Sequence, residues 1–174
     1  TCHLMGLMSP GGVHSSQHHI VALAGILNEH GIKTDVHAFL DGRDTPPESA
    51  AGFVAEFEKD TAAMENVKIT TVAGRFYAMD RDKRWDRVEK AYNNMVMADG
   101  KRFADAVEAI KASYAEKVSD EFVVPAVIGN YQGFEDGDAV LMANFRADRA
   151  REILYALADR EFTGFERKKT IELS

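Results

Sequence analysis

The chain contains little that would stabilise a small secreted domain or anchor it in a membrane. Cys2 is its single cysteine, so no disulfide can form within the chain, and we expect a reducing compartment, the cytoplasm. No apolar run approaches the ~20 residues that a membrane-spanning helix requires, so no membrane partner is expected. Of its 174 residues 45% are hydrophobic, which is enough for one domain with a proper core.

The motifs of several common enzyme sites are missing as well. There is neither a Walker A loop nor a Gly-x-Gly-x-x-Gly loop, so nothing supports nucleotide binding. Without a Gly-x-Ser-x-Gly elbow, Ser15 and Ser16 are interpreted as helix caps and not as nucleophiles. The adjacent His18 and His19 point to different faces of a helix, and no spacing of Cys, Asp or Glu fits a metal pattern. We therefore expect no metal site in this chain.

Acidic residues outnumber basic ones, 28 to 21, but the arginines gather in particular places. The formal net charge is −7, and nucleic-acid binders usually carry a basic face, so nucleic acid is not an expected partner. In an acidic protein, arginines that are grouped in a few loops concentrate positive potential on a small spot instead of a broad surface.

Segments that are typical of strands and helices alternate along the chain. Apolar and β-branched runs predict strands over residues 1–8, 34–40, 67–73 and 139–143, and an edge strand or extended segment over 121–128, which Pro125 interrupts. Apolar residues at helical spacing predict helices over residues 17–30, 48–59, 84–97, 103–117 and 148–157. This alternation predicts a three-layer α/β/α domain with a largely parallel sheet, a single domain over residues 1–174.

Three short segments set arginine beside aspartate, and each follows a predicted strand: residues 41–44, 74–82 and 144–151. In an α/β protein they fall on loops at the carboxyl ends of strands, where ligands usually bind. The planar fork of arginine matches the geometry of phosphate and carboxylate groups, and neighbouring aspartates can hold that fork in place. The segments therefore predict a site for a small, highly charged anion.

Each segment also has a purely structural interpretation. Arg146 and Arg149 share one side of a helical first turn, where they would either hold an anion between them or form a salt bridge to Asp148 or to a carboxylate at the sheet end. Arg75 and Arg81 would either contact a ligand or belong to a surface network of charges, which contributes little stability.

The segment over residues 41–44 and the loop before the first helix leave similar alternatives. In the former, one of the two carboxylates would orient Arg43 while the other faces the ligand, where a carboxylate near a ligand hydroxyl can move a proton. Alternatively, the Asp-Gly pair forms a tight turn. His14 would donate to a phosphoryl oxygen, become phosphorylated itself, or be a loop histidine bonded to the backbone.

Taken together, these segments resemble the cofactor-independent phosphoglycerate mutases. The resemblance extends over nearly the whole chain, in order, which makes it far more specific than any one motif. It is carried by HLMGL at 3–7, GGVHS at 11–15, HAFLDGRDTPP at 37–47, GRFYAMDRDKRWDR at 74–87, DEFVVP at 120–125 and NFRADRAR at 144–151.

The resemblance implies that this chain is one part of a two-domain enzyme. Family members have an alkaline-phosphatase-like domain with two Mn²⁺ ions and a serine that becomes phosphorylated. A second domain, inserted into the first, binds 2-phosphoglycerate and 3-phosphoglycerate. This chain resembles the inserted domain only, and by itself it would be inactive and hold no cofactor. The lysine that family members contribute from near the domain junction has no match here.

The resemblance also implies a role for individual residues. Asp44 would be the acid/base group for the glycerate hydroxyls. Substrate contacts would come from His14, Arg43, Asp44, Arg75, Arg81, Arg146 and Arg149. Two other functions fit the same residues: a free-standing module that binds a sugar phosphate without catalysis, and a phosphatase-type subunit that a separate chain completes.

Overall fold

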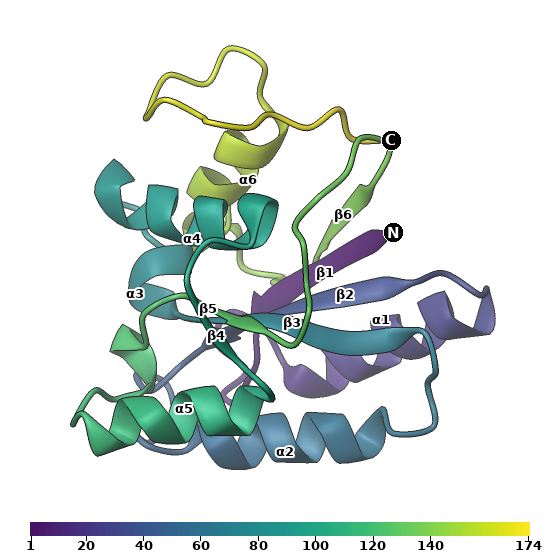
Figure 1. The fold of residues 1–174 in the computed structure, drawn as a ribbon. Coiled ribbons are helices and arrows are strands. Elements are labelled where there is room, and N and C mark those ends of the chain that lie inside the picture. Colours follow the sequence, from purple (N-terminus) through teal and green to yellow (C-terminus); the bar gives the residue numbers. More distant parts are fainter.

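A six-stranded sheet runs through the middle of the molecule in the computed structural model, which describes residues 1–174 (Figure 1). The strand order is β4-β5-β3-β2-β1-β6, and every neighbouring pair is parallel except β3 with β5. The strands are β1 Cys2–Leu7, β2 Thr34–Leu40, β3 Val67–Gly74, β4 Lys101–Phe103, β5 Ala126–Ile128 and β6 Ala139–Met142. The predicted, largely parallel sheet is therefore confirmed.

Helices cover both faces of the sheet because the central strands bury side chains on both sides. Successive residues of β1 show this, since Leu4 packs into one hydrophobic cluster and Met5 into the other. One face carries α1 Gln17–Glu29, α2 Ala50–Asp60 and α5 Ala106–Ala115; the other carries α3 Arg75–Ala78, α4 Trp85–Met97 and α6 Arg151–Ala158 (Figure 1). The predicted three layers are thus present.

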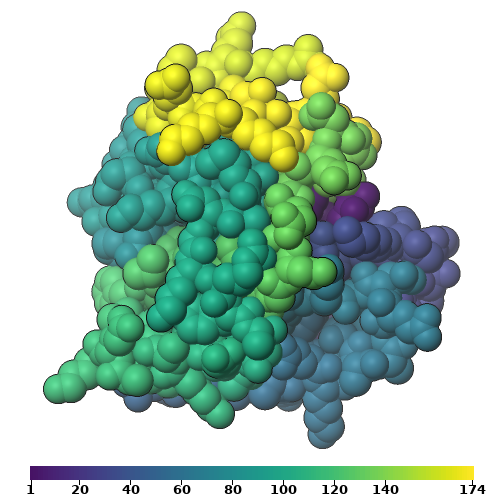
Figure 2. All heavy atoms as spheres, viewed as in Figure 1, coloured from purple at the N-terminus to yellow at the C-terminus, as the bar shows by residue number.

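The C-terminal residues complete the second face. They follow α6 and pack against the teal segment that contains α4 (Figure 2). There the hydroxyl of Tyr92 donates a 2.7 Å hydrogen bond to the carbonyl of Lys169. None of the helices is long and apolar enough to span a bilayer.

The region between α4 and β6 differs from the prediction. Phe103, where the sequence predicts the start of a helix, is the last residue of strand β4. The helix α5 begins at Ala106, because the carboxylate of Asp105 caps it by accepting from the Glu108 amide at 2.7 Å. β5 lies between β3 and β4, so it is not the expected edge strand. Pro125 directly precedes β5, where its missing N–H costs no ladder bond.

Two helix starts near the sheet end also differ. The segment after β3 contains the single helical turn α3, and the last helix begins at Arg151, after a separate 3₁₀ turn, η2 Ala147–Arg149. Ser16 occupies the N-cap position of α1, but its side chain makes no capping bond, so the expected serine cap is wrong in that respect.

Two buried histidines join the central strands beneath α4. His3 Nδ1 lies 2.9 Å from His37 Nε2, His3 Nε2 lies 3.0 Å from a carboxylate oxygen of Asp138, and His37 Nδ1 lies 2.8 Å from the Thr71 hydroxyl. The His3 ring stacks on Phe134 with centroids 3.5 Å apart. Burial lowers the pKa of His3, and it lowers the pKa of His37 far below its usual range.

We expect these histidines to make the fold sensitive to mild acid. In the unfolded chain they take up protons near their ordinary pKa of about 6.5, whereas in the folded chain they remain neutral at that pH. Their contribution to stability is therefore complete above about pH 6.5 and is lost as the pH falls below it. Urea unfolding midpoints should be lower at about pH 5 than at about pH 8.

Single substitutions identify the source of this dependence. His37→Gln should reduce the difference between the two midpoints, while the same change at the exposed His30 should preserve it. Wild-type urea midpoints that stay constant over this pH range would show that the two buried histidines do not make the fold sensitive to acid.

Candidate anion-binding site

The carboxyl ends of four parallel strands, β6, β1, β2 and β3, meet at one edge of the sheet. The loops that leave these strands carry all of the predicted site residues, as expected for ligand sites in α/β folds. His14 follows β1, Arg43 and Asp44 follow β2, Arg75 and Arg81 follow β3, and Arg146 and Arg149 follow β6.

Arg75 forms the buried base of the site. It is the first residue of α3, and its side chain is only 3% exposed. Its Nη1 donates to a carboxylate oxygen of Asp41 at 2.8 Å and to one of Asp44 at 2.6 Å. Burial alone would lower the pKa of Arg75, but the two carboxylates outweigh it and raise that pKa. Arg75 is therefore a fixed cation.

Arg43 has a different partner from the one predicted. Neither carboxylate of its own segment holds its guanidinium; its Nη1 lies 3.4 Å from Glu121 Oε1, and the side chain is 60% exposed. Asp41 instead accepts from the backbone amides of Arg43 and Asp44, at 3.2 and 3.0 Å. The tight turn considered for this segment is present, because a short carboxylate side chain readily bonds the backbone just after it.

Asp148 joins the outer arginines. One of its oxygens accepts from Arg81 Nη1 at 2.9 Å, and the other lies 3.0 Å from Arg146 Nε. Arg146 therefore forms the salt bridge to Asp148 that its structural interpretation predicts. Arg149 does not share this carboxylate and donates instead to the carbonyl of Met79 at 3.1 Å.

Arg149 is the arginine of the site whose positive charge no carboxylate neutralises. It forms no ion pair, and burial followed by the positive charges of Arg81, Arg75 and Arg43 lowers its pKa. With Arg43 and Arg75 it lines a cavity of about 310 Å³, whose other walls are Phe76, Asp80, Asp82, Arg87, Glu121 and Phe122. Three of the predicted arginines thus converge on one cavity that suits an anion.

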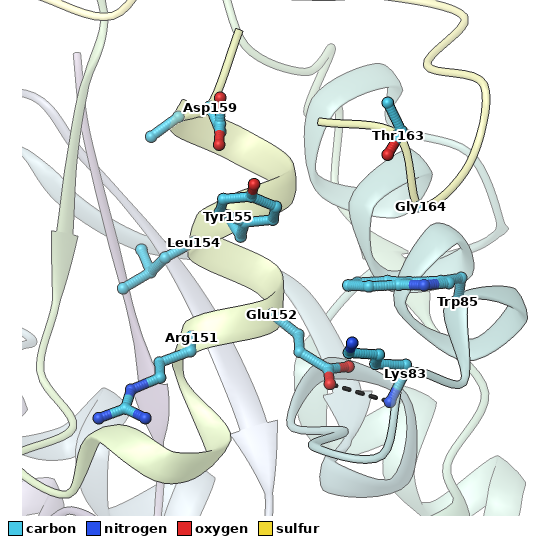
Figure 3. Close-up of a pocket in the computed structure, with 10 residues that line it drawn as sticks. Lys83, Trp85, Arg151, Glu152, Leu154, Tyr155, Asp159, Thr163 and Gly164 are labelled. Carbon is cyan, nitrogen blue, oxygen red and sulfur yellow. Dashed lines mark hydrogen bonds between the residues drawn. The ribbon is translucent and has the colours of Figure 1, made fainter. Parts of the chain in front are cut away.

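A larger groove of about 820 Å³ lies beside this cavity, between α6 and the start of α4 (Figure 3). Tyr155 on α6 and Trp85 on α4 stand on either side of it, and the Lys83 amide donates to Glu152 at 2.9 Å (Figure 3). None of the predicted site residues lines this groove. The smaller cavity is therefore the candidate anion site. Of the predicted site residues, three line it and four do not: Arg43, Arg75 and Arg149 line it, whereas His14, Asp44, Arg81 and Arg146 lie outside its lining.

Comparison with known proteins identifies the family of this chain. The family model described as "BPG-independent PGAM N-terminus" matches residues 1–174. The chain belongs to this family, the 2,3-bisphosphoglycerate-independent phosphoglycerate mutases. The resemblance stated from the sequence motifs is confirmed.

Individual relatives match closely but are much longer. Identity is 59% over 174 residues with the 2,3-bisphosphoglycerate-independent phosphoglycerate mutase of Rhodopseudomonas palustris, and 56% over 171 residues with that of Myxococcus xanthus. These alignments cover 100% and 95% of this chain but 34% and 33% of those proteins. A crystal structure of Leishmania mexicana phosphoglycerate mutase at low cobalt concentration is similar with a TM-score of 0.93 and 35% identity, covering 99% of this chain and 34% of that one. The chain spans about a third of its relatives' length.

In this member of the mutase family, His14 lies between the inner and outer groups of charges. Burial, and then the charge of Arg75, lowers its pKa, so the imidazole is neutral. Its Nε2 is 3.9 Å from Asp44 and its Nδ1 is 3.6 Å from Asp148, and Nδ1 has no hydrogen-bond partner. The ring is therefore not bonded to the backbone, as one alternative held; it is buried and does not line the cavity.

Two carboxylates of the site were not among the predicted ligand contacts. Asp41, which is 1% exposed, holds Arg75, and Glu121 holds Arg43. The Asp-Gly turn signal marked Asp41 as a turn residue, but nothing local indicates a link between positions 34 residues apart. No group of three or more His, Cys, Asp or Glu side chains is arranged to hold a metal ion.

Proposed function

We propose that this chain is the substrate-binding part of a phosphoglycerate mutase that interconverts 2-phosphoglycerate and 3-phosphoglycerate in glycolysis and gluconeogenesis. The observation that carries the proposal is Arg149, which faces a cavity shared with Arg43 and Arg75 and has no carboxylate of its own. A phosphoglycerate brings about −1.5 to −2 charges on its phosphate and one more on its carboxylate. Four arginines and three carboxylates line the cavity, so such a ligand would neutralise an excess of positive charge.

In the proposed reaction, a serine elsewhere in the full-length protein takes the phosphoryl group while this chain retains glycerate. The arginines would hold the carboxylate as the molecule turns and would steady the transferring group, because fixed charges stabilise phosphoryl transfer without reorganisation. Asp44, close to both Arg75 and His14, would move the hydroxyl proton. Retention also limits hydrolysis, since water reaching the phosphoserine would make the enzyme a phosphatase.

The remaining two thirds of the protein would supply the nucleophile. We propose, on the family resemblance, that it is the alkaline-phosphatase-like domain with its serine and two Mn²⁺ ions, and that it is the partner of this chain. The lone, buried Cys2 suits a reducing compartment, so we place the enzyme in the cytoplasm.

This division of labour predicts that the isolated chain lacks mutase activity while the full-length protein has it. Phosphorus NMR separates 2-phosphoglycerate from 3-phosphoglycerate and follows their interconversion directly. Titration calorimetry should find only weak binding to the isolated chain, because half of the site is missing. Turnover by the isolated chain, or binding tighter than about 1 μM, a free energy near −8 kcal/mol, would refute the division. A full-length protein that interconverts neither isomer would refute the proposed function.

A further inference from the structure

Asp41 is a buried carboxylate to which the proposed reaction assigns no part. It is only 1% exposed, and both of its oxygens already accept hydrogen bonds from the protein, so a ligand held in the cavity cannot reach it. Arg75, which Asp41 holds, does line the cavity. Asp41 can therefore act on a ligand only through its neighbours.

The hydrogen bonds of Asp41 tie three loops together. One oxygen accepts from Arg75 Nη1 and from the amides of Arg43 and Asp44, while the other accepts from the Ser9 hydroxyl at 2.6 Å. These donors lie after β1, β2 and β3. Burial alone would raise the pKa of Asp41, but the bonds from Ser9, the Asp44 amide and Arg75 outweigh it and keep that pKa below its usual value. Asp41 is therefore a permanent anion in a fixed place.

The other partner of Arg75 is less constant. Asp44 is more exposed than Asp41, and in the proposed reaction it turns to a substrate hydroxyl and exchanges a proton. A protonated or displaced Asp44 no longer neutralises Arg75. During that step Asp41 is the one carboxylate that still holds the guanidinium.

We propose that Asp41 is a positioning residue, which keeps Arg75 at the base of the cavity while Asp44 carries out proton transfer. This inference rests on the proposed function. It predicts that loss of the Asp41 charge matters only where Arg75 is present. If Asp41 served only to fold its loop, loss of its charge would lower activity equally with or without Arg75.

Asp41→Asn in the full-length protein isolates the charge. The amide oxygen can still accept from the Arg43 and Asp44 amides, and the amide nitrogen can donate to Ser9, so the turn is retained. We expect kcat/KM to fall roughly 10- to 100-fold, the scale of a hydrogen bond to a charged group, with most of the loss in kcat. In an Arg75→Ala background the same change should cost about twofold or less, because the two residues act as a unit. Equal losses in both backgrounds would overturn the proposal.

Binding of inorganic phosphate to the full-length protein gives a second readout that does not depend on turnover. Removal of a negative charge would by itself tighten anion binding, whereas a loosened Arg75 weakens it. We expect Asp41→Asn to weaken phosphate binding several-fold in calorimetry. Asp86→Asn, at an exposed position outside the cavity, should leave binding and turnover unchanged. Phosphate binding that tightens or is unchanged in Asp41→Asn overturns the positioning role, even if the wild-type protein proves not to be a mutase.

Discussion

Replacement of Arg149 with alanine in the full-length protein should lower kcat/KM for 3-phosphoglycerate by a factor that corresponds to roughly 1.5–3 kcal/mol or more, the scale of a charged hydrogen bond. The other arginines of the site already have carboxylate partners: Arg75 has Asp41 and Asp44, and Arg43 has Glu121. Arg149 has only the carbonyl of Met79, so most of its charge remains available to a ligand.

Arg151 provides a matched control for this substitution. It lies two residues further along, at the start of α6, is exposed and forms no ion pair or hydrogen bond. Arg151→Ala should therefore leave steady-state kinetics close to those of the wild type, although it removes the same charge. Arg149→Lys should recover only part of the lost activity, because an ammonium group keeps the charge but not the planar fork. An unchanged kcat/KM in Arg149→Ala would remove Arg149 from the substrate contacts.

The order of strands and helices was predictable because local signals mark most of their boundaries. Gly31, with φ of 69°, ends α1 where only glycine fits easily, and β-branched residues mark β3. The elements that escaped prediction are short. β4 has three residues, and its pairing with β5 decides its conformation, which no local pattern encodes.

The arginines and aspartates of the candidate site could be picked out from the sequence, but which arginine pairs with which carboxylate could not. Arginine and aspartate stand side by side in each segment, which suggests local pairs. In the fold, Arg75 pairs with carboxylates of the β2 loop, Arg81 with Asp148 and Arg43 with Glu121, each at least 31 positions away. Only Arg146 pairs within its own segment. Long-range pairing depends on how the loops meet at the sheet edge, and that follows from strand order and not from spacing.

Contacts around Gly74 connect the end of β3 to the turn that carries Glu121. Gly74 ends β3, directly before Arg75, and its amide donates to the Val123 carbonyl at 2.8 Å. The 3₁₀ turn η1 Asp120–Phe122 packs against it, and the Asp120 carboxylate accepts from the Ser49 and Ala50 amides at 2.9 and 2.8 Å. Glu121 extends from this turn toward Arg43. The position of η1 therefore sets both the start of α2 and one wall of the cavity.

Gly74→Ala should consequently destabilise the chain by about 3 kcal/mol, the upper end of the usual cost of overpacking. A Cβ at this position would lie 2.2 Å from the Glu121 carbonyl oxygen and 2.6 Å from its carbon, and these backbone atoms cannot rotate away. Gly52→Ala is the matched control, since a Cβ there meets nothing within 4 Å and α2 should gain roughly 0.5–1 kcal/mol from the better helix former. Urea unfolding of the two variants should therefore shift in opposite directions from the wild type. A Gly74→Ala midpoint at or above that of the wild type would mean that η1 can move without cost, and that Glu121 and Arg43 are not held where the structure has them.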